Sequence, residues 1–270
     1  MSATAAFQPH ASLYANAHAH APARAASAAA AATATAAASA CASTHAIVLN
    51  WEDVLAPTTL LGQRVGLESS RQALQLAHAM LQQDVYLQQA LAGIEEQAVQ
   101  LLTTAAAIGP VLVVTDKSLK YMELTCAVFF PRLAAFLLQA NMSSKMSLLS
   151  PALHRIQVVA APRRFASAAE RASWRASLVH NVCADLTARC SASASMSPPA
   201  FGVVAVSAAD ADAVTCVGVM QRCSPLALPK CVQVADPMSL SLEAFFAQLQ
   251  TLQRYVCTAA AHAGAFSMHL

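Results

Sequence analysis

Several side chains that could hold a phosphate or a metal ion stand at the ends of short apolar runs. They are Asn50, Glu52, Asp53, Thr115 and Asp116. The runs, residues 46–49 and 111–114, are uninterrupted, which is typical of strands buried on both faces of a parallel sheet. Open α/β sheets bind their ligands beyond the carboxyl ends of the strands. We therefore expect these side chains to lie at one edge of a sheet.

The rest of the chain supplies the other elements that such a sheet needs. Further strands are expected at residues 155–160, 201–207 and 230–234. Apolar residues at helical spacing predict two or more helices between residues 68 and 108, with Gly93 as the break and Gly109-Pro110 as the end. Other helices are expected at residues 119–130, 131–140 and 166–182, and after Ser239 or Ser241. A loop is expected at residues 60–66 and a linker at residues 184–200.

This order of elements predicts a three-layer, Rossmann-like α/β domain over residues 45–258, with a mainly parallel sheet. Right-handed crossovers would place helices on both of its faces. Residues 1–44 are rich in alanine, serine, threonine and histidine and lack the apolar pattern of a core, so we expect a disordered tail. Residues 259–270 are expected to form a flexible C-terminal tail.

The stretch around residue 50 resembles the first motif of the haloacid dehalogenase-like (HAD-like) phosphohydrolases, Asp-x-Asp-x-Thr. It is similar in particular to a eukaryotic branch with the motif Asp-Trp-Asp-Asp-Thr-Leu-Leu-Pro-Thr, where this chain reads Asn50-Trp-Glu-Asp-Val-Leu-Ala-Pro-Thr58. Thr115 matches the hydroxyl residue of the second motif, and Trp174-Arg175 stands where the branch has Trp-Lys. The resemblance runs in order over residues 46–257 and implies the HAD fold.

The resemblance implies a phosphate site but argues against the family's usual reaction. In the family, the first Asp attacks phosphorus, the second Asp transfers protons, and Mg²⁺ is held by the first Asp and a fourth-motif Asp. The corresponding residues here are Asn50, Glu52 and Ala208. A neutral amide is not a competent carboxylate nucleophile, and Mg²⁺ prefers hard anionic oxygens.

Other residues keep part of the family's pattern. Arg175 retains the positive charge of the third-motif lysine, although a guanidinium is a planar fork rather than a compact charge. Asp210 and Asp212 could replace the carboxylate missing at Ala208 only if the loop changed its register. The expected residual phosphate or ligand pocket consists of Asn50, Glu52, Asp53, Thr115, Asp116, Arg175 and Asp210, with no metal ligand and no catalytic residue.

We therefore expect a catalytically inactive HAD-like protein, a pseudophosphatase, that acts as a binding or regulatory module. Its partner would be a protein or a small anionic ligand, and no cofactor is expected. The alternative is an active phosphohydrolase or phosphotransferase in which Glu52 or Asp53 takes over the chemistry with Mg²⁺. A third interpretation is an unrelated α/β domain.

Composition argues against two classes of partner. Charged residues make up 11% of the chain and the net charge is +2, without a basic run, so we expect no nucleic-acid binding. No stretch has the roughly 18 strongly apolar residues of a membrane span. The 8 cysteines lack the spacing of a zinc site and are expected to be reduced, packed thiols. We expect a cytoplasmic protein, and the acid-poor N-terminus makes plastid or mitochondrial targeting the alternative.

Overall fold

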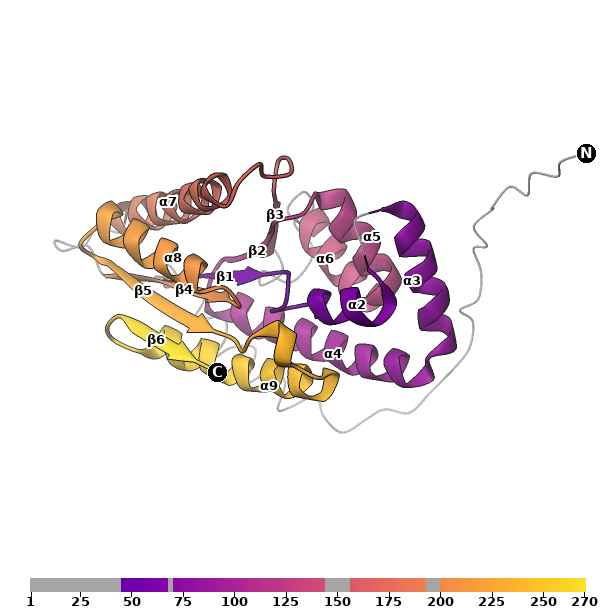
Figure 1. The fold of residues 1–270 in the computed structure, drawn as a ribbon. Helices are drawn as coiled ribbons and strands as arrows, with labels where there is room; N and C mark the ends of the chain where they lie inside the picture. Colours follow the sequence, from indigo (N-terminus) through magenta and orange to yellow (C-terminus); the bar gives the residue numbers. More distant parts are fainter. Residues whose placement is uncertain (1–44, 68–69, 144–155, 193–199) are drawn as a thin grey trace, which may run out of the picture. The chain divides into compact units, whose positions relative to one another are not determined.

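The computed structural model describes residues 45–67, 70–143, 156–192 and 200–270 (Figure 1). The predicted disordered tail, residues 1–44, lies outside the described residues.

Six parallel strands of the described chain form one sheet in the order β3-β2-β1-β4-β5-β6. The strands are β1 (His45–Asn50), β2 (Val111–Thr115), β3 (Ile156–Ala160), β4 (Phe201–Ser207), β5 (Ala227–Gln233) and β6 (Phe266–His269). β1 is central, since it pairs with β2 on one side and with β4 on the other. The carboxyl ends of these three strands therefore meet at one edge, as the sequence predicted.

The described helices cover both faces of the sheet. They are α2 (Thr58–Val65), α3 (Arg71–Gln83), α4 (Val85–Ile108), α5 (Leu119–Phe129), α6 (Pro131–Ser143), α7 (Ala168–Ala192), α8 (Asp210–Cys223), the short 3₁₀ helix η2 (Pro237–Ser239) and α9 (Leu242–Ala261). In Figure 1, α7 and α8 lie on one side of the strands, and α4 and α9 lie on the other. The molecule is a three-layer, Rossmann-like α/β domain, which confirms the predicted fold class.

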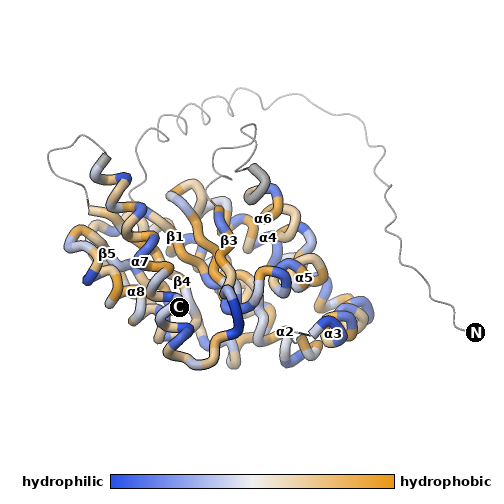
Figure 2. The backbone as a smooth tube through the Cα atoms, turned by 90° about the horizontal axis from the view of Figure 1, so that it is seen from above, coloured by the Kyte–Doolittle hydropathy of each residue, from blue (hydrophilic) through white to orange (hydrophobic). Residues whose placement is uncertain are grey.

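Each central strand is apolar on both faces because it separates two cores. Ile47 and Leu49 of β1 pack into the core under α4 and α9, whereas Ala46 and Val48 pack into the core under α7 and α8. Side chains alternate between the two faces of a strand, so a strand between two cores needs an unbroken apolar run. In Figure 2, the tube along the central strands is accordingly coloured mostly as hydrophobic.

Several predicted boundaries differ from the structure. Residues 60–66 are not a loop, because α2 covers them and ends at Gly66, whose left-handed φ of 65° suits a glycine. The break between α3 and α4 lies at Asp84, whose carboxylate accepts a hydrogen bond from Leu87 N at 2.9 Å, and Gly93 lies inside α4. The predicted linker is wrong over residues 184–192, where α7 continues.

The expected flexible C-terminal tail is also wrong, because β6 extends the sheet beside β5. The β4–β5 connection runs through α8 and the β5–β6 connection through α9, and both lead one strand outward. α8 and α9 pack on opposite faces of the sheet. The two crossovers therefore have opposite hand, so the right-handed rule that we applied to the whole sheet fails at its last strand.

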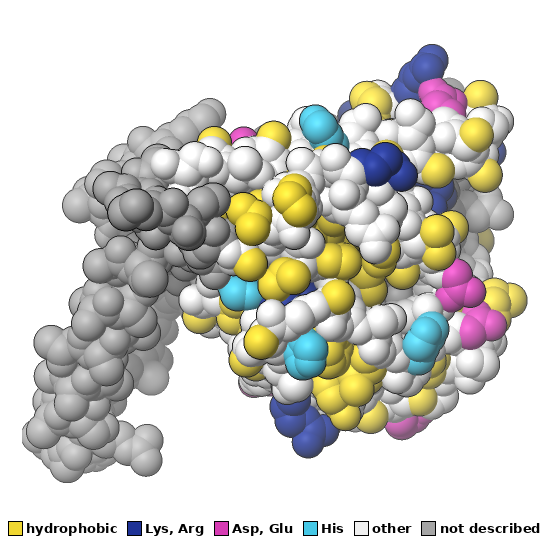
Figure 3. Space-filling view, turned by 90° about the vertical axis from the view of Figure 1, so that its left-hand side faces the viewer, with side chains coloured by type: hydrophobic (Ala, Val, Ile, Leu, Met, Phe, Trp, Pro, Cys, Tyr) yellow, Lys and Arg dark blue, Asp and Glu magenta, His cyan; other side chains and the backbone are white. Residues whose placement is uncertain are grey.

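The surface shown in Figure 3 carries Lys, Arg, Asp and Glu side chains as scattered groups among polar and hydrophobic ones. Within the described residues, no helix is long and apolar enough to cross a membrane.

Candidate functional site

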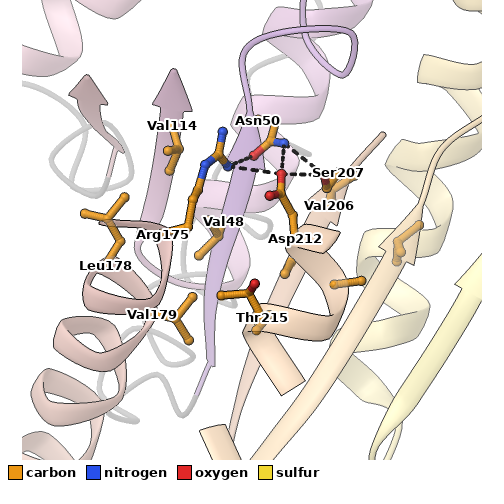
Figure 4. A pocket seen from close by; sticks show the side chains of 14 residues that line it. Val48, Asn50, Val114, Arg175, Leu178, Val179, Val206, Ser207, Asp212 and Thr215 are labelled. Carbon is orange, nitrogen blue, oxygen red and sulfur yellow. Dashed lines mark hydrogen bonds and ion pairs between the residues drawn. The ribbon is translucent and has the colours of Figure 1, made fainter. Parts of the chain in front are cut away.

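The site lies at the carboxyl edge of the sheet, where three neighbouring strands end. Asn50, Thr115 and Ser207 are the last residues of β1, β2 and β4. The N-terminal parts of α7 and α8 lie beside this edge and direct Arg175 and Asp212 toward Asn50 (Figure 4). The strand order thus brings together residues that are up to 162 positions apart.

Asn50 is buried and its amide group is fully engaged. Its Oδ1 accepts a hydrogen bond from Arg175 Nη1. Its Nδ2 donates to Ser207 Oγ and to Asp212 Oδ2, both at 3.0 Å. The amide therefore bridges a guanidinium and a carboxylate, which a carboxylate at this position could not do without placing two negative charges in contact.

Two arginines and two aspartates form a closed ion network around Asn50. Arg171 donates to Asp116 Oδ2 at 2.6 Å and to the two Asp212 oxygens at 2.7 and 2.9 Å. Arg175 donates to Asp116 Oδ1 through Nε at 3.0 Å and Nη2 at 2.7 Å. Its Nη1 also lies 3.5 Å from Asp212 Oδ2. The planar guanidinium groups satisfy both carboxylates in a fork geometry that lysine could not reproduce.

The network sets the charge states of its members. Burial alone would raise the pKa of Asp212, but the hydrogen bonds and charges of Arg171 and Arg175 outweigh it and hold that pKa below its usual range. Burial likewise opposes the charge on Arg171, but hydrogen bonds with Asp212 and Asp116 raise its pKa above the usual value. Arg171 and Asp212 therefore stay charged at neutral pH.

Glu52 accepts hydrogen bonds from two donors beside this network. Its Oε1 accepts a hydrogen bond from Thr115 Oγ1, and its Oε2 accepts one from Asp116 N at 3.3 Å. Burial raises the pKa of Glu52, although the Thr115 hydroxyl partly offsets the rise. A hydroxyl and a backbone N–H are the kind of donors that hold a phosphate oxygen, and in this chain they bind the protein's own carboxyl group.

Two predicted site residues have other partners. Asp53 has a left-handed φ of 59° and binds the start of α2: its Oδ1 accepts from Thr59 N at 2.8 Å and from Thr58 Oγ1 at 3.1 Å. Asp210 is exposed and accepts a hydrogen bond from the side chain of Gln233. The structure thus brings Asn50, Glu52, Thr115, Asp116 and Arg175 together, but it gives Asp53 and Asp210 structural contacts at the rim.

Asp212, four positions after Ala208, places a carboxylate beside Asn50. Residues two positions apart in a helix point in nearly opposite directions, so Asp212 faces Asn50 while Asp210 faces β5. Ala208 itself packs against the core under α4 and α9. Arg171 was not predicted at all, although its spacing of four residues from Arg175 places both on the same helix face.

A small cavity lies under the network and is shown in Figure 4. Its volume is about 30 Å³, and its walls include Val48, Val114 and Val179 beside the polar groups of the network. One water molecule needs about 10–15 Å³ of such a cavity, so this space holds a few waters at most and does not admit a phosphomonoester. Among the described residues, no group of three or more His, Cys, Asp or Glu side chains is arranged to hold a metal ion.

Comparison of the chain with protein-family models, with curated proteins and with solved structures finds no match.

Proposed function

We propose that this protein is a catalytically inactive HAD-like domain, a pseudophosphatase, that acts as a binding or regulatory module. The observation that carries the proposal is the state of Asn50. The residue stands where the family's nucleophile would be, and its amide is bound on both sides by Arg175, Ser207 and Asp212. A neutral side chain in this position can neither attack phosphorus nor add charge to a Mg²⁺ site.

The phosphate-binding groups implied by the resemblance are already paired within the chain. The carboxyl group of Glu52 accepts hydrogen bonds from the Thr115 hydroxyl and from the N–H of Asp116. The Asp116 carboxylate forms an ion pair with Arg175, the counterpart of the family's lysine. A phosphate would have to displace both carboxyl groups, and each displaced group would be left partly buried without its partner, at a cost of about 1–3 kcal/mol or more for a charged group.

The charge balance also opposes an anion. The carboxylates of Asp116 and Asp212 pair with the two guanidinium groups, and the carboxyl group of Glu52 lies beside them on Asp116 N, so a phosphate dianion would enter a region that is already neutral or negative. This balance argues against a small anionic ligand at the edge of the sheet. A protein partner is the class of ligand that we expect.

The proposal is tested by a phosphatase assay of the full chain with p-nitrophenyl phosphate and Mg²⁺. We expect no turnover by the unmodified protein or by Asn50→Asp. The substitution places a carboxylate about 3 Å from Asp212 Oδ2. The guanidinium of Arg175 still lies against that position, so Mg²⁺ could not bind between the two carboxylates. Asp210→Asn, which removes a carboxylate outside the network, is the matched control.

Calorimetric titration with inorganic phosphate completes the test, and we expect no heat of binding at millimolar concentrations. Magnesium-dependent turnover by the unmodified chain that Glu52→Gln abolishes would overturn the proposal in favour of an active phosphohydrolase.

A further inference from the structure

A histidine and a cysteine meet between α7 and α8: His180 lies five residues after Arg175 on α7, and Cys223 is the last residue of α8. His180 Nδ1 lies 3.1 Å from Cys223 Sγ. His180 is exposed and Cys223 is half-buried, so both the base and the sulfur are accessible from solvent. Imidazole can accept the proton of a thiol at this distance, and the thiolate is the reactive form of cysteine.

A second thiol lies behind this pair. Cys183 follows His180 by about one turn of α7, is fully buried, and belongs to the core under α7 and α8 against which Cys223 packs. Burial, with a smaller contribution from Cys223, raises the pKa of the Cys183 thiol to about 12. The two residues therefore differ in character: Cys223 is half-buried beside a base, whereas Cys183 is shielded and its thiol stays protonated at neutral pH.

We propose that Cys223 and Cys183 form a redox-sensitive thiol pair that a peroxide oxidises to a disulfide between α8 and α7. His180 takes the proton of Cys223, and the thiolate attacks one peroxide oxygen. The S–O bond forms, the O–O bond breaks, and the leaving hydroxide takes the proton from His180 to become water. Cys223 is then a sulfenic acid.

The second step uses Cys183. Its sulfur attacks the Cys223 sulfur, the S–S bond forms, and the S–O bond breaks. The departing hydroxide combines with the Cys183 proton as water. In total, two thiols lose two electrons and two protons, and one hydrogen peroxide becomes two waters. A thiol reductant reverses the reaction by attack on the accessible Cys223 sulfur.

The other described thiols lack this combination of features. Cys216 lies 3.7 Å from Met220 Sδ and Cys231 lies 3.8 Å from the carbonyl oxygen of Ala213, and both thiols are buried. Cys257 on α9 is exposed, on the opposite face of the sheet from His180. It is the matched control, because it is more exposed than Cys223 without the same histidine beside it.

The disulfide would tie together the two helices that carry the ion network. Arg171 and His180 lie on α7, and their partners Asp212 and Cys223 lie on α8, so the polar contacts and the thiol contact join the same pair of helices at two levels. The proposal does not depend on whether the domain binds phosphate or catalyses a reaction.

The first experiment needs no variant. The full chain is reduced, treated with N-ethylmaleimide for short times, and analysed by peptide mass spectrometry; we expect Cys223 to be labelled before Cys257. In a second sample, hydrogen peroxide should produce a Cys183–Cys223 disulfide that dithiothreitol removes. Faster labelling of Cys257, or a disulfide that maps to another pair of cysteines, would overturn the proposal.

Two variants test the separate roles. His180→Gln should slow the labelling of Cys223 about tenfold, less than the roughly 10²–10⁴-fold typical of enclosed general bases because His180 is exposed, and it should leave Cys257 unchanged. Cys183→Ser should stop peroxide oxidation of Cys223 at the sulfenic acid, which dimedone traps. Unchanged labelling in the first variant, or no trapped adduct in a folded second variant, contradicts the mechanism.

Discussion

Removing Arg175 should destabilise the domain much more than removing another arginine of an ion pair near the same helix. Arg175 pairs with Asp116 at 2.7 Å and its side chain is 7% exposed, whereas Arg163 pairs with Glu170 at 2.6 Å and its side chain is 77% exposed. The two pairs have similar lengths, but Arg175 is buried and also contacts Asn50 and Asp212, whereas Arg163 is exposed. Arg175→Met and Arg163→Met are therefore a matched comparison.

The expected magnitudes follow from burial. Breaking a buried ion pair costs about 3–5 kcal/mol because the remaining charge is left without its partner, whereas an exposed pair contributes about 0–1 kcal/mol. Arg171 still binds Asp116 and Asp212 after the substitution. We therefore expect about 3 kcal/mol for Arg175→Met, the low end of the range.

The assay is urea unfolding followed by circular dichroism at neutral pH. With an m-value of about 3 kcal/mol/M, the midpoint should fall by about 1 M for Arg175→Met and by less than about 0.3 M for Arg163→Met. Adding Asp116→Asn to Arg175→Met should recover part of the loss, because it neutralises a half-buried carboxylate that has lost one of its two guanidinium partners. Equal shifts for the two arginine variants would refute the view that the network holds the carboxyl edge together.

Three further substitutions test the electrostatics and packing of the fold. Burial raises the folded-state pKa of Glu52 above 4.5, so the ionised carboxylate destabilises the fold at neutral pH and this penalty disappears as the pH falls toward 4.5. In urea titrations, the stability of Glu52→Gln relative to the unmodified chain should therefore decline as the pH falls from 7.5 to 5, and a constant difference would contradict the shift. Lys230 is 1% exposed and its Nζ donates to the carbonyls of Ala260 and His262, both at 2.7 Å. Lys230→Met should lower the free energy of unfolding by about 1–3 kcal/mol and speed hydrogen exchange in the last turn of α9; unchanged exchange would show that this turn does not need the ammonium group. A Cβ on Gly202 would lie 2.7 Å from His45 Cδ2 and 3.0 Å from Lys230 Cε, whereas one on Gly264 would meet no heavy atom closer than 3.6 Å. In thermal melting, Gly202→Ala should lower the stability by about 1–3 kcal/mol, and Gly264→Ala should change it little.

The strands could be predicted from the sequence because both of their faces are buried. Residues 111–115 and 201–207 match β2 and β4 residue for residue. β6 was missed because it is an edge strand, where Phe266 and Met268 alternate with exposed residues over only four positions. Such a short alternation gives a weaker signal than a continuous apolar run.

The sequence predicted the site residues at the strand ends and Arg175, but it missed Arg171 and did not favour Asp212 over Asp210. Asn50 and Thr115 are fixed by the strands, and their neighbourhood follows from the parallel order. The choice of Asp212 over Asp210 depends on where α8 begins, and a shift of one or two residues in a helix start changes which side chain faces the sheet. Glu52 and Asp53 are adjacent, yet the left-handed backbone at Asp53 sends their carboxyl groups to different partners.

Under the proposed relationship to HAD-like phosphohydrolases, the network replaces a diffusible cation by cations that belong to the chain. A Mg²⁺ site needs several carboxylate oxygens that share one small ion. Here Asn50 removes one negative charge, and the guanidinium groups of Arg171 and Arg175 bind the Asp116 and Asp212 carboxylates through directed hydrogen bonds. A guanidinium cannot dissociate from the edge of the sheet as a metal ion can, and it has no open coordination position for a phosphate oxygen. Under this proposal, the same network that takes the place of Mg²⁺ also joins the carboxyl ends of β1, β2 and β4 to α7 and α8.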